Sequence, residues 1–464
     1  MEDLVHASAA ALAKAIQSRQ VSSEEVVKAH IARIEEVNPR LNAVVRLTAE
    51  SALIQAREAD AALAGGRSTN PLHGVPVTIK DNIETAGVVS TSGTLGRANF
   101  VPAEDATVVA RMKAAGAIVI GKTNLPELGM AFESDNLVYG RTNNPYDLKR
   151  TPGGSSGGEA AIIAAGGSPL GLGNDAGGSI RLPSHFCGTA GIKPSTGRFP
   201  RTGHFPPPGG LTDAIWQVGP MARFVEDLIL AMPLLYGVDW RDPAVVPMPL
   251  GDPGAVVLKR LRVSFHTDNG IVTPTPETAA VVRAAAGSLA DAGAAVEEAR
   301  PAGIEQTHEI VSGLFLADGG AGIKAALDVA GTKEAHSLTV KLQRMQNQWA
   351  LTGAAAGALI FRWDQFRSAM LGFMQHHDAI VCPVHAFPAM PHGEASRREN
   401  FPALSYTMAY NLTGWPAAVV RGGTSPEGLP IGVQVVARPW REDVALAVAR
   451  HLEAALGGWK RPPL

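Results

Sequence analysis

The chain has 464 residues, of which 45% are hydrophobic and 18% are charged, and its formal net charge is −2 at pH 7. A composition this apolar supplies a large buried core and excludes intrinsic disorder. The balanced charge lacks the basic surface of a nucleic-acid-binding protein, so we predict no nucleic-acid partner.

The cysteine count and the N-terminal residues narrow the class further. Only Cys187 and Cys382 are present, too few for a disulfide scaffold, which favours a reducing compartment and a cytoplasmic location. The N-terminus carries no basic signal segment, and no run of 18 apolar residues predicts a membrane span. No CxxC or HExxH spacing occurs, so we predict neither a metal nor another cofactor.

The first predicted elements are helices. Residues 22–36 have an amphipathic pattern, and Ser22 with Glu25 three residues later makes a capping box at its start. We expect residues 1–64 to be helices that pack on a later core.

From about residue 72, short apolar runs alternate with Gly/Pro turns and helical patterns. This alternation predicts an α/β fold with a central, largely covered sheet. Residues 200–330 are richer in Pro and Gly, so we expect insertions over the sheet rather than a separate domain, and one domain over 1–464. The expected elements are strands 75–79, 117–120, 379–384 and 431–437 and helices 106–116, 159–166, 277–293 and 441–457.

Two glycine patterns resemble nucleotide-binding loops but lack their context. Residues 116–123, GAIVIGKT, match GxxxxGK[ST], yet the four variable positions should themselves be strand, so no loop is left to hold a phosphate. Residues 171–176, GLGNDA, match GxGxxA, but Pro183 interrupts any following helix. We expect a core strand at the first pattern, with Lys122 structural, and no nucleotide at either.

Residues 151–160, TPGGSSGGEA, contain two overlapping GxSxG patterns centred on Ser155 and Ser156. This pattern is typical of a nucleophile elbow, and the expected helix at 159–166 would follow it. The residues before it form turns rather than the strand that an elbow needs, and no specific downstream acid and histidine stand out. The elbow therefore remains a disfavoured alternative.

A second glycine–serine site, GNDAGGSIRLPSHFCGTAG (173–191), suggests a different chemistry. Ser179 follows two glycines, whose backbone N–H groups can face a substrate and form an oxyanion hole. Serine needs a base, and Lys80 ends an apolar strand in HGVPVTIKDNIETAG. Burial lowers the pKa of a lysine until the neutral amine can accept a proton. Taken alone, a lysine at a strand end is more often a solvated cap.

Three stretches together, HGVPVTIKDN, TPGGSSGG and GNDAGGSIRLPSHFCGTAGIKPSTG, closely resemble the amidase signature family. The resemblance is strong over about residues 65–230 and weaker elsewhere. It implies the amidase signature fold, a central mixed and twisted β-sheet covered on both faces by α-helices. Residues 1–64 would be helices packed on the core, and 231–464 would complete the sheet, its helices and the substrate-pocket loops.

The resemblance implies a role for each matching residue. Ser179 corresponds to the acylated nucleophile, Lys80 to the base, and Ser155 to a bridging serine whose peptide bond to Gly154 is cis. The implied oxyanion hole consists of the backbone amides of Ala176, Gly177, Gly178 and Ser179.

Other matching or neighbouring positions carry supporting expectations. Asp175 and Arg181 match structural positions, and Ser156 is expected to hydrogen-bond within its turn. Asn174 stands where the family usually has Thr or Ser, which predicts tuning of the site rather than its loss. No histidine is required, so we expect structural roles for two nearby histidines, His73 and His185.

The apolar segments 203–216, 313–322 and 349–363 are expected to be loops that line the substrate pocket. An ordinary core role for their side chains is an equal alternative. The expected pocket residues are Phe132, Gly154, Phe205, Trp216, Leu314 and Phe315.

We therefore predict an amidase for small apolar or aromatic amides of the aryl-acylamide type. Aryl esters are expected substrates too, and carbamates (urethanes) are further candidates. The alternatives are the glutaminase subunit of a tRNA-dependent amidotransferase, disfavoured because no convergent Arg/Asp set for a free amino acid is visible, and a non-catalytic complex subunit. The expected partner is a small-molecule amide, ester or carbamate, with no membrane contact and a monomeric or homodimeric enzyme.

Overall fold

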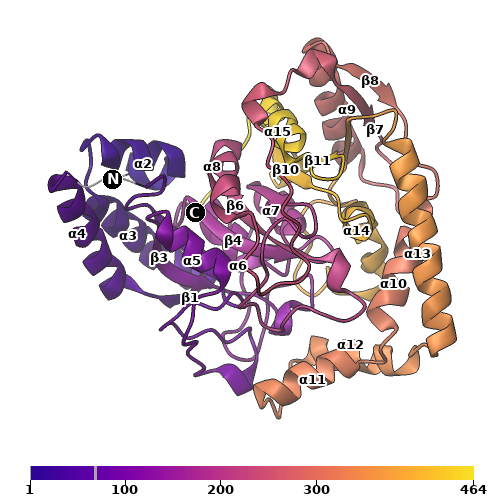
Figure 1. Ribbon diagram of the computed structural model, residues 1–464, viewed down its shortest axis with the longest axis horizontal. Helices are drawn as coiled ribbons and strands as arrows, with labels where there is room; N and C mark the ends of the chain where they lie inside the picture. Colours follow the sequence, from indigo (N-terminus) through magenta and orange to yellow (C-terminus); the bar gives the residue numbers. More distant parts are fainter. Residues whose placement is uncertain (1, 67–69) are drawn as a thin grey trace.

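The computed structural model describes residues 2–66 and 70–464 (Figure 1). Residues 67–69, inside the expected 65–230 core, lie outside the described part. The strands are β1 (Val44–Leu47), β2 (Pro76–Lys80), β3 (Ile118–Thr123), β4 (Leu170–Asp175), β5 (Ala190–Lys193), β6 (Gln217–Ala222), β7 (Arg262–Phe265), β8 (Ala295–Glu298), β9 (Ala379–Pro383), β10 (Ala417–Thr424) and β11 (Pro430–Ala437).

Among the described residues these strands form one mixed sheet in the order β1-β3-β2-β4-β6-β5-β10-β11-β9-β7-β8. Strand β2 is parallel to β3 and β4, and β7 is parallel to β8 and β9. The other neighbours are antiparallel. The expected α/β fold with a central mixed sheet is therefore confirmed.

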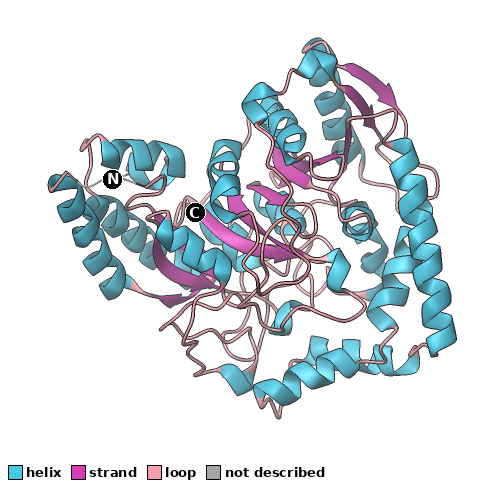
Figure 2. Cartoon of the chain, in the orientation of Figure 1, coloured by secondary structure: helices cyan, strands magenta, loops and turns pink. Residues whose placement is uncertain are grey.

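Helices lie around the outside of the sheet, and loops gather in the lower middle of the view (Figure 2). The N-terminal helices occupy one end of the molecule, and α11 to α13 border the other (Figure 1). The helices are α1 (Glu2–His6), α2 (Ala9–Gln17), α3 (Ser23–Leu41), α4 (Ala49–Ala64), α5 (Thr107–Ala114), α6 (Gly157–Ala164), α7 (Arg181–Cys187), α8 (Val225–Leu235), α9 (Pro276–Asp291), α10 (Thr307–Leu316), α11 (Ala321–Ala330), α12 (Ser337–Gln348), α13 (Gly353–Phe373), α14 (Ser405–Leu412) and α15 (Glu442–Leu456).

Both faces of the sheet are covered because successive side chains of a strand point to opposite faces. On β11, Val433 and Val435 join a buried cluster with apolar residues of α8, α9 and α15. The other face of the same strand contributes Val436 to a second cluster, with Leu182 of α7 and Met408 of α14. This two-sided burial explains why the predicted strands are apolar along most of their length.

The sequence predicts the start of α3 correctly. Ser22 Oγ accepts a hydrogen bond from the Glu25 N–H at 3.1 Å, and Glu25 Oε2 accepts one from the Ser22 N–H at 2.8 Å. This reciprocal pair satisfies two backbone N–H groups at the helix terminus, as a capping box does. The eight elements expected after residue 72 also occur, with ends shifted by up to three residues.

Two expectations about the middle of the chain are wrong. Residues 200–330 are not only insertions over the sheet, because they supply β6 in its centre and β7 and β8 at one edge. Segments 313–322 and 349–363 are not pocket loops, because α10, α11 and α13 occupy most of them. Strand β6 is buried at every position, and α13 carries apolar side chains such as Phe361 on its exposed side, so neither sequence shows a clear polar stripe.

No single helix in residues 2–66 and 70–464 combines the length and hydropathy needed to cross a membrane. One helical pair, Ile304–Leu316 with Ala321–Ala330, meets that requirement only when its two members are taken together, and it bends by 48°.

Candidate active site

Lys80 is the last residue of β2, a strand buried at every position between β3 and β4. Its side chain has no exposed surface. The amine Nζ lies 2.6 Å from Ser155 Oγ, 3.0 Å from Ser156 Oγ and 2.5 Å from Asn174 Oδ1. The lysine is therefore a buried group with polar partners, rather than the solvated cap that a strand end usually carries.

Ser155 and Ser156 lie in the turn that leads into α6. The Gly154–Ser155 peptide bond is cis, as the sequence resemblance implies. Gly154 packs so closely on the backbone of residues 131–133 that a Cβ would lie 2.7 Å from Ala131 O. No strand runs directly into this turn, and the hydroxyl of Ser155 contacts a lysine rather than a histidine, so the nucleophile elbow is not formed.

Ser179 lies in the turn between β4 and α7. The Ser156 N–H donates to the Ser179 carbonyl oxygen at 3.1 Å, which holds the two serine turns against each other. Ser179 is 6% exposed, whereas Lys80 and Ser155 are completely buried. Of these three residues, only Ser179 has any exposed surface.

Asp175 holds the shape of the Ser179 turn. Its carboxylate accepts from the Gly178 N–H at 2.8 Å and the Ile180 N–H at 3.1 Å. It also pairs with Arg181 through two bonds of 2.9 Å, and both side chains are fully buried. Burial alone would raise the pKa of Asp175, but Arg181 and Asn411 hold that pKa below its usual value.

The backbone amides of the turn differ in what they bind. Among the described residues, the N–H groups of Ala176, Gly177 and Ser179 have no hydrogen-bond acceptor. The Gly178 N–H is already committed to Asp175. Three of the four expected oxyanion donors are therefore left to bind an added oxygen atom.

Gly178 is required by backbone geometry. Its φ is +125°, a conformation that L side chains rarely adopt. A Cβ at this position would lie 2.5 Å from Thr407 Oγ1, which itself donates to the Gly177 carbonyl at 2.8 Å. Helix α14 thus closes on the turn so tightly that only glycine fits.

Burial lowers the pKa of Lys80 well below its ordinary value, while the carboxylates of Asp175 and Glu159 oppose that change. Glu159, in the first turn of α6, is itself fully buried, and burial raises its pKa to about 7. Thr123 Oγ1 donates to it at 2.7 Å, and Thr78 Oγ1 donates to its other oxygen. Glu159 therefore ties α6 to β2 and β3, beside the lysine.

The six expected pocket residues are Gly154, which packs on the backbone of Phe132, and five apolar side chains that belong to three clusters. Phe132, Leu314 and Phe315 belong to one apolar cluster. The ring of Phe132 lies near the oxyanion turn, because a Cβ on Gly177 would be 3.7 Å from Phe132 Cζ. Phe205 packs in a second cluster and Trp216 in a third.

The residues expected to be structural have structural contacts. Lys122 Nζ donates to the Ile83 carbonyl and to Thr85 Oγ1, inside the strand predicted over the GxxxxGK[ST] pattern. His185 accepts from the Gly432 N–H at 2.7 Å through Nδ1, and its Nε2 lies 3.0 Å from the Phe387 carbonyl. His73 Nε2 lies 3.0 Å from the Ala59 carbonyl.

Sequence reasoning missed the direct contacts of Ser156 and Asn174 with Lys80. Ser156 was expected only to bond within its turn, and Asn174 only to tune the site. The adjacent serines and the departure at Asn174 were visible signals, but neither shows which side chain meets the lysine. Glu159 carried no signal, because an acidic residue in the first turn of a helix is usually solvated.

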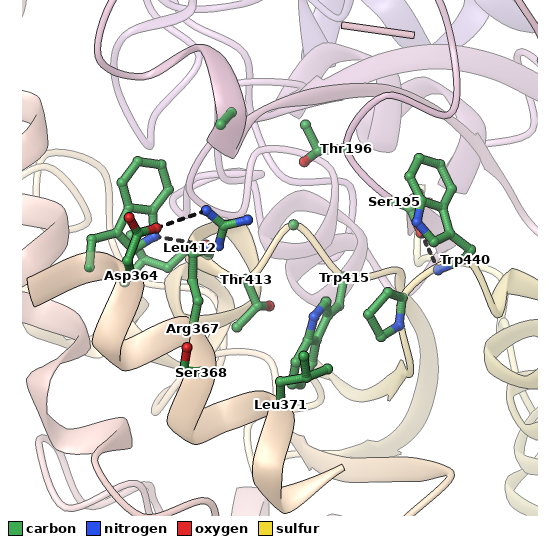
Figure 3. Close-up of a pocket in the computed structure, with 14 residues that line it drawn as sticks. Ser195, Thr196, Asp364, Arg367, Ser368, Leu371, Leu412, Thr413, Trp415 and Trp440 are labelled. Atoms are coloured by element: carbon green, nitrogen blue, oxygen red, sulfur yellow. Dashed lines mark hydrogen bonds and ion pairs between the residues drawn. The ribbon is translucent and has the colours of Figure 1, made fainter. Parts of the chain in front are cut away.

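A separate pocket of about 550 Å³ lies between α13 and the segment after α14 (Figure 3). Asp364 and Arg367, which pair at 3.2 Å, stand on one side, and Ser195 with Trp440 stand on the other. Lys80, Ser155 and Ser179 do not line this pocket.

Comparison with protein families shows which family this chain matches. The family model described as Amidase matches residues 25–446. The chain belongs to the amidase signature family. It is therefore an amidase, a hydrolase that acts on carbon–nitrogen bonds.

Several curated relatives of this amidase are similar over nearly the whole chain. Fatty-acid amide hydrolase 2-A of Danio rerio is 35% identical over 98% of this chain and 90% of its own length. A glutamyl-tRNA(Gln) amidotransferase subunit of Moorella thermoacetica is 34% identical over 99% of both chains. An acylamidase of Rhodococcus erythropolis is 34% identical over 96% of this chain and 95% of its own.

Solved structures agree with this assignment. A 6-aminohexanoate cyclic dimer hydrolase complexed with substrate superposes with a TM-score of 0.87 at 30% identity, over 99% of both chains. A bacterial aryl acylamidase of the amidase signature family superposes with a TM-score of 0.85 at 26% identity, over 97% of this chain and 96% of its own. Because these relatives differ in substrate, similarity alone leaves the substrate class of this amidase open.

Proposed function

We propose that this amidase hydrolyses small apolar or aromatic amides through an acyl-enzyme formed on Ser179. One observation carries the proposal: the buried amine of Lys80 lies 2.6 Å from Ser155 Oγ, beside a turn that exposes Ser179 and three unpaired amides. This arrangement supplies a base, a relay, a nucleophile and an oxyanion hole without histidine.

In the proposed reaction the neutral Lys80 amine accepts the Ser155 hydroxyl proton while Ser155 accepts the proton of Ser179. Ser179 Oγ then bonds to the substrate carbonyl carbon, and the N–H groups of Ala176, Gly177 and Ser179 hold the resulting oxyanion. The C–N bond breaks as Ser155 gives a proton to the leaving nitrogen and regains one from Lys80. Water attacks the acyl-enzyme through the same relay and releases the acid.

The preference for apolar or aromatic amides is supported by Phe132. Its ring lies next to the turn that contains Gly177. The centroid of this ring is 5.9 Å from the centroid of the Phe401 ring. Leu314 and Phe315 of α10 extend the same apolar cluster. An acyl or aryl group bound to Ser179 would contact this surface, and aryl esters and carbamates present a similar carbonyl.

The test compares the wild type with Ser179→Ala on a short-acyl nitroanilide, by release of nitroaniline. We expect release by the wild type and a loss of at least about 10³-fold in the variant. Equal release by both proteins would contradict the assignment of Ser179. A panel of acyl, aryl and carbamate analogues then measures the preference, and a preference for polar acyl groups would contradict the proposed substrate class.

The second candidate is a glutaminase component of a tRNA-dependent amidotransferase, favoured by the similarity to the Moorella thermoacetica protein over nearly the full length of both chains. It predicts ammonia release from glutamine only when partner proteins are added. Glutamine inert under both conditions, with nitroanilide cleaved, would exclude it. Labelling of Ser179 by a serine-directed fluorophosphonate would exclude a non-catalytic role in a complex.

A further inference from the structure

Three side chains surround the amine of Lys80, and each offers it one oxygen atom. They are Ser155 Oγ at 2.6 Å, Ser156 Oγ at 3.0 Å and Asn174 Oδ1 at 2.5 Å. A neutral primary amine has two hydrogens and one lone pair. The three contacts must therefore be divided between two acceptors of N–H and one donor to the lone pair.

Asn174 and Ser156 are the two acceptors. The Asn174 amide oxygen has no hydrogen to donate, so it can only accept from Lys80. Ser156 Oγ donates its single hydrogen to the Asn174 backbone carbonyl at 3.3 Å, which leaves it as an acceptor toward the amine. The third direction, the lone pair, then faces the hydroxyl of Ser155.

We propose that Asn174 is a positioning residue that accepts one hydrogen of the neutral Lys80 amine and so directs the lone pair at Ser155. This inference rests on the proposed function, because it concerns the direction of the proton relay. Asn174 offers the amine an amide oxygen rather than a hydroxyl. A hydroxyl can accept from the amine or donate to it, whereas the amide oxygen can only accept.

Asn174 is slightly more exposed than the other groups around the Lys80 amine. It is 7% exposed, whereas Ser155, Ser156 and Lys80 are fully buried. The ionisable groups that face Lys80 are Glu159 from α6, Asp175 at the end of β4 and His204 from the loop after β5.

The experiment measures the rate at which a fluorophosphonate labels Ser179 as a function of pH, in the wild type and in three variants. Labelling reports the relay without a choice of substrate. For the wild type we expect a rate that rises with pH as Lys80 loses its proton and then reaches a plateau. Thermal unfolding of each variant confirms that it is folded.

Asn174→Asp places a carboxylate in the position of the amide. An opposite charge at this distance stabilises the ammonium form of Lys80. The pH range over which the labelling rate rises, here called the rising limb, should therefore shift to higher pH by about 1–3 units. The rate should return toward the wild-type plateau above the new limb. Asn347→Asp, on the exposed side of α12, adds the same charge elsewhere and should leave the limb in place.

Asn174→Leu keeps the branched arrangement of four side-chain heavy atoms but removes the acceptor. We expect the plateau to fall about 10–100-fold with no upward shift of the limb. Asn174→Thr restores an oxygen and should recover most of that loss. Comparison of Asn174→Leu with Asn174→Thr also tests the inference if Asn174→Asp does not fold. A merely structural role of Asn174 would not give the Thr variant a higher plateau rate than the Leu variant.

The outcomes separate the inference from the proposed function. An unshifted limb in Asn174→Asp, or a plateau in Asn174→Leu equal to that of Asn174→Thr, overturns the role of Asn174 and leaves the amidase mechanism intact. A wild type that neither hydrolyses amides nor is labelled at Ser179 overturns both.

Discussion

Two lysines, Lys80 of β2 and Lys122 of β3, are fully buried on neighbouring parallel strands, and they differ in what surrounds them. Burial lowers the pKa of Lys80 well below its ordinary value and lowers that of Lys122 to about 8. Lys80 meets two serine hydroxyls and an amide, beside the Ser179 turn. Lys122 meets a backbone carbonyl and Thr85.

The comparison shows that burial makes a lysine available as a base, but its partners decide whether it can act as one. The partners of Lys122 are the Ile83 carbonyl, which has no proton to give, and the Thr85 hydroxyl, which donates to that same carbonyl at 3.5 Å, so Lys122 braces the loop after β2. Ser155 can both give and accept a proton, so Lys80 can drive a relay. The same physical cause, desolvation, thus lowers the pKa of both lysines, and Lys80 is the one whose partners suit the proposed relay.

The sharpest test of this contrast removes each lysine in turn. Lys80→Ala should lower nitroanilide turnover by about 10³-fold or more, because the relay loses its base. Lys122→Met should leave turnover per folded molecule within a few-fold but lower the unfolding free energy by about 1–3 kcal/mol, because the Ile83 carbonyl loses its partner. Turnover at near wild-type rate in Lys80→Ala would break the comparison.

The charges of Lys80 and Lys122 both act on Glu159, which lies near them. Titration of Glu159 should make the free energy of unfolding depend on pH. Its folded pKa of about 7 exceeds the unfolded value, so the folded state binds more protons between pH 4.5 and 7 and stability falls as pH rises through that window. The loss should be about 3 kcal/mol at 1.36 kcal/mol per unit.

Glu159→Gln should remove this slope because glutamine does not titrate. Denaturant unfolding of both proteins at several pH values between 4.5 and 7 measures the difference. Parallel stability curves for the variant and the wild type would show that Glu159 does not carry the pH dependence.

A smaller effect on turnover is expected from a substitution of Gly178, which lies in the Ser179 turn near Lys80. Gly178→Ala should lower turnover about 10–100-fold, since backbone strain of about 1–3 kcal/mol and the contact with Thr407 would displace the Ser179 turn. Gly237 also has a positive φ, of 97°, but a Cβ there meets no atom within 4 Å. Gly237→Ala should therefore lose stability with normal turnover, and equal kinetic losses in both variants would argue against a local effect.

Much of the fold was predictable because its elements carry local signals. The capping box at Ser22 and Glu25 marks α3, and apolar runs mark β2, β3, β9 and β11. The other strands, β1, β4, β5, β6, β7, β8 and β10, were not predicted. Four of them, β1, β5, β7 and β8, have only four residues each, which is too few positions to show a pattern. The helices α10 and α13 were taken for loops because apolar and small residues lie on all their sides.

The sequence by itself determined the family, and it predicts the reactive groups, because Lys80, Ser155 and Ser179 lie in motifs whose glycines constrain the backbone around them. Only the tertiary structure decided which groups touch the lysine. The contact of Asn174 with Lys80 joins residues 94 positions apart, and Asn411 reaches Asp175 across 236. Such contacts depend on how strands are ordered in the sheet, and no local pattern of residues records that order.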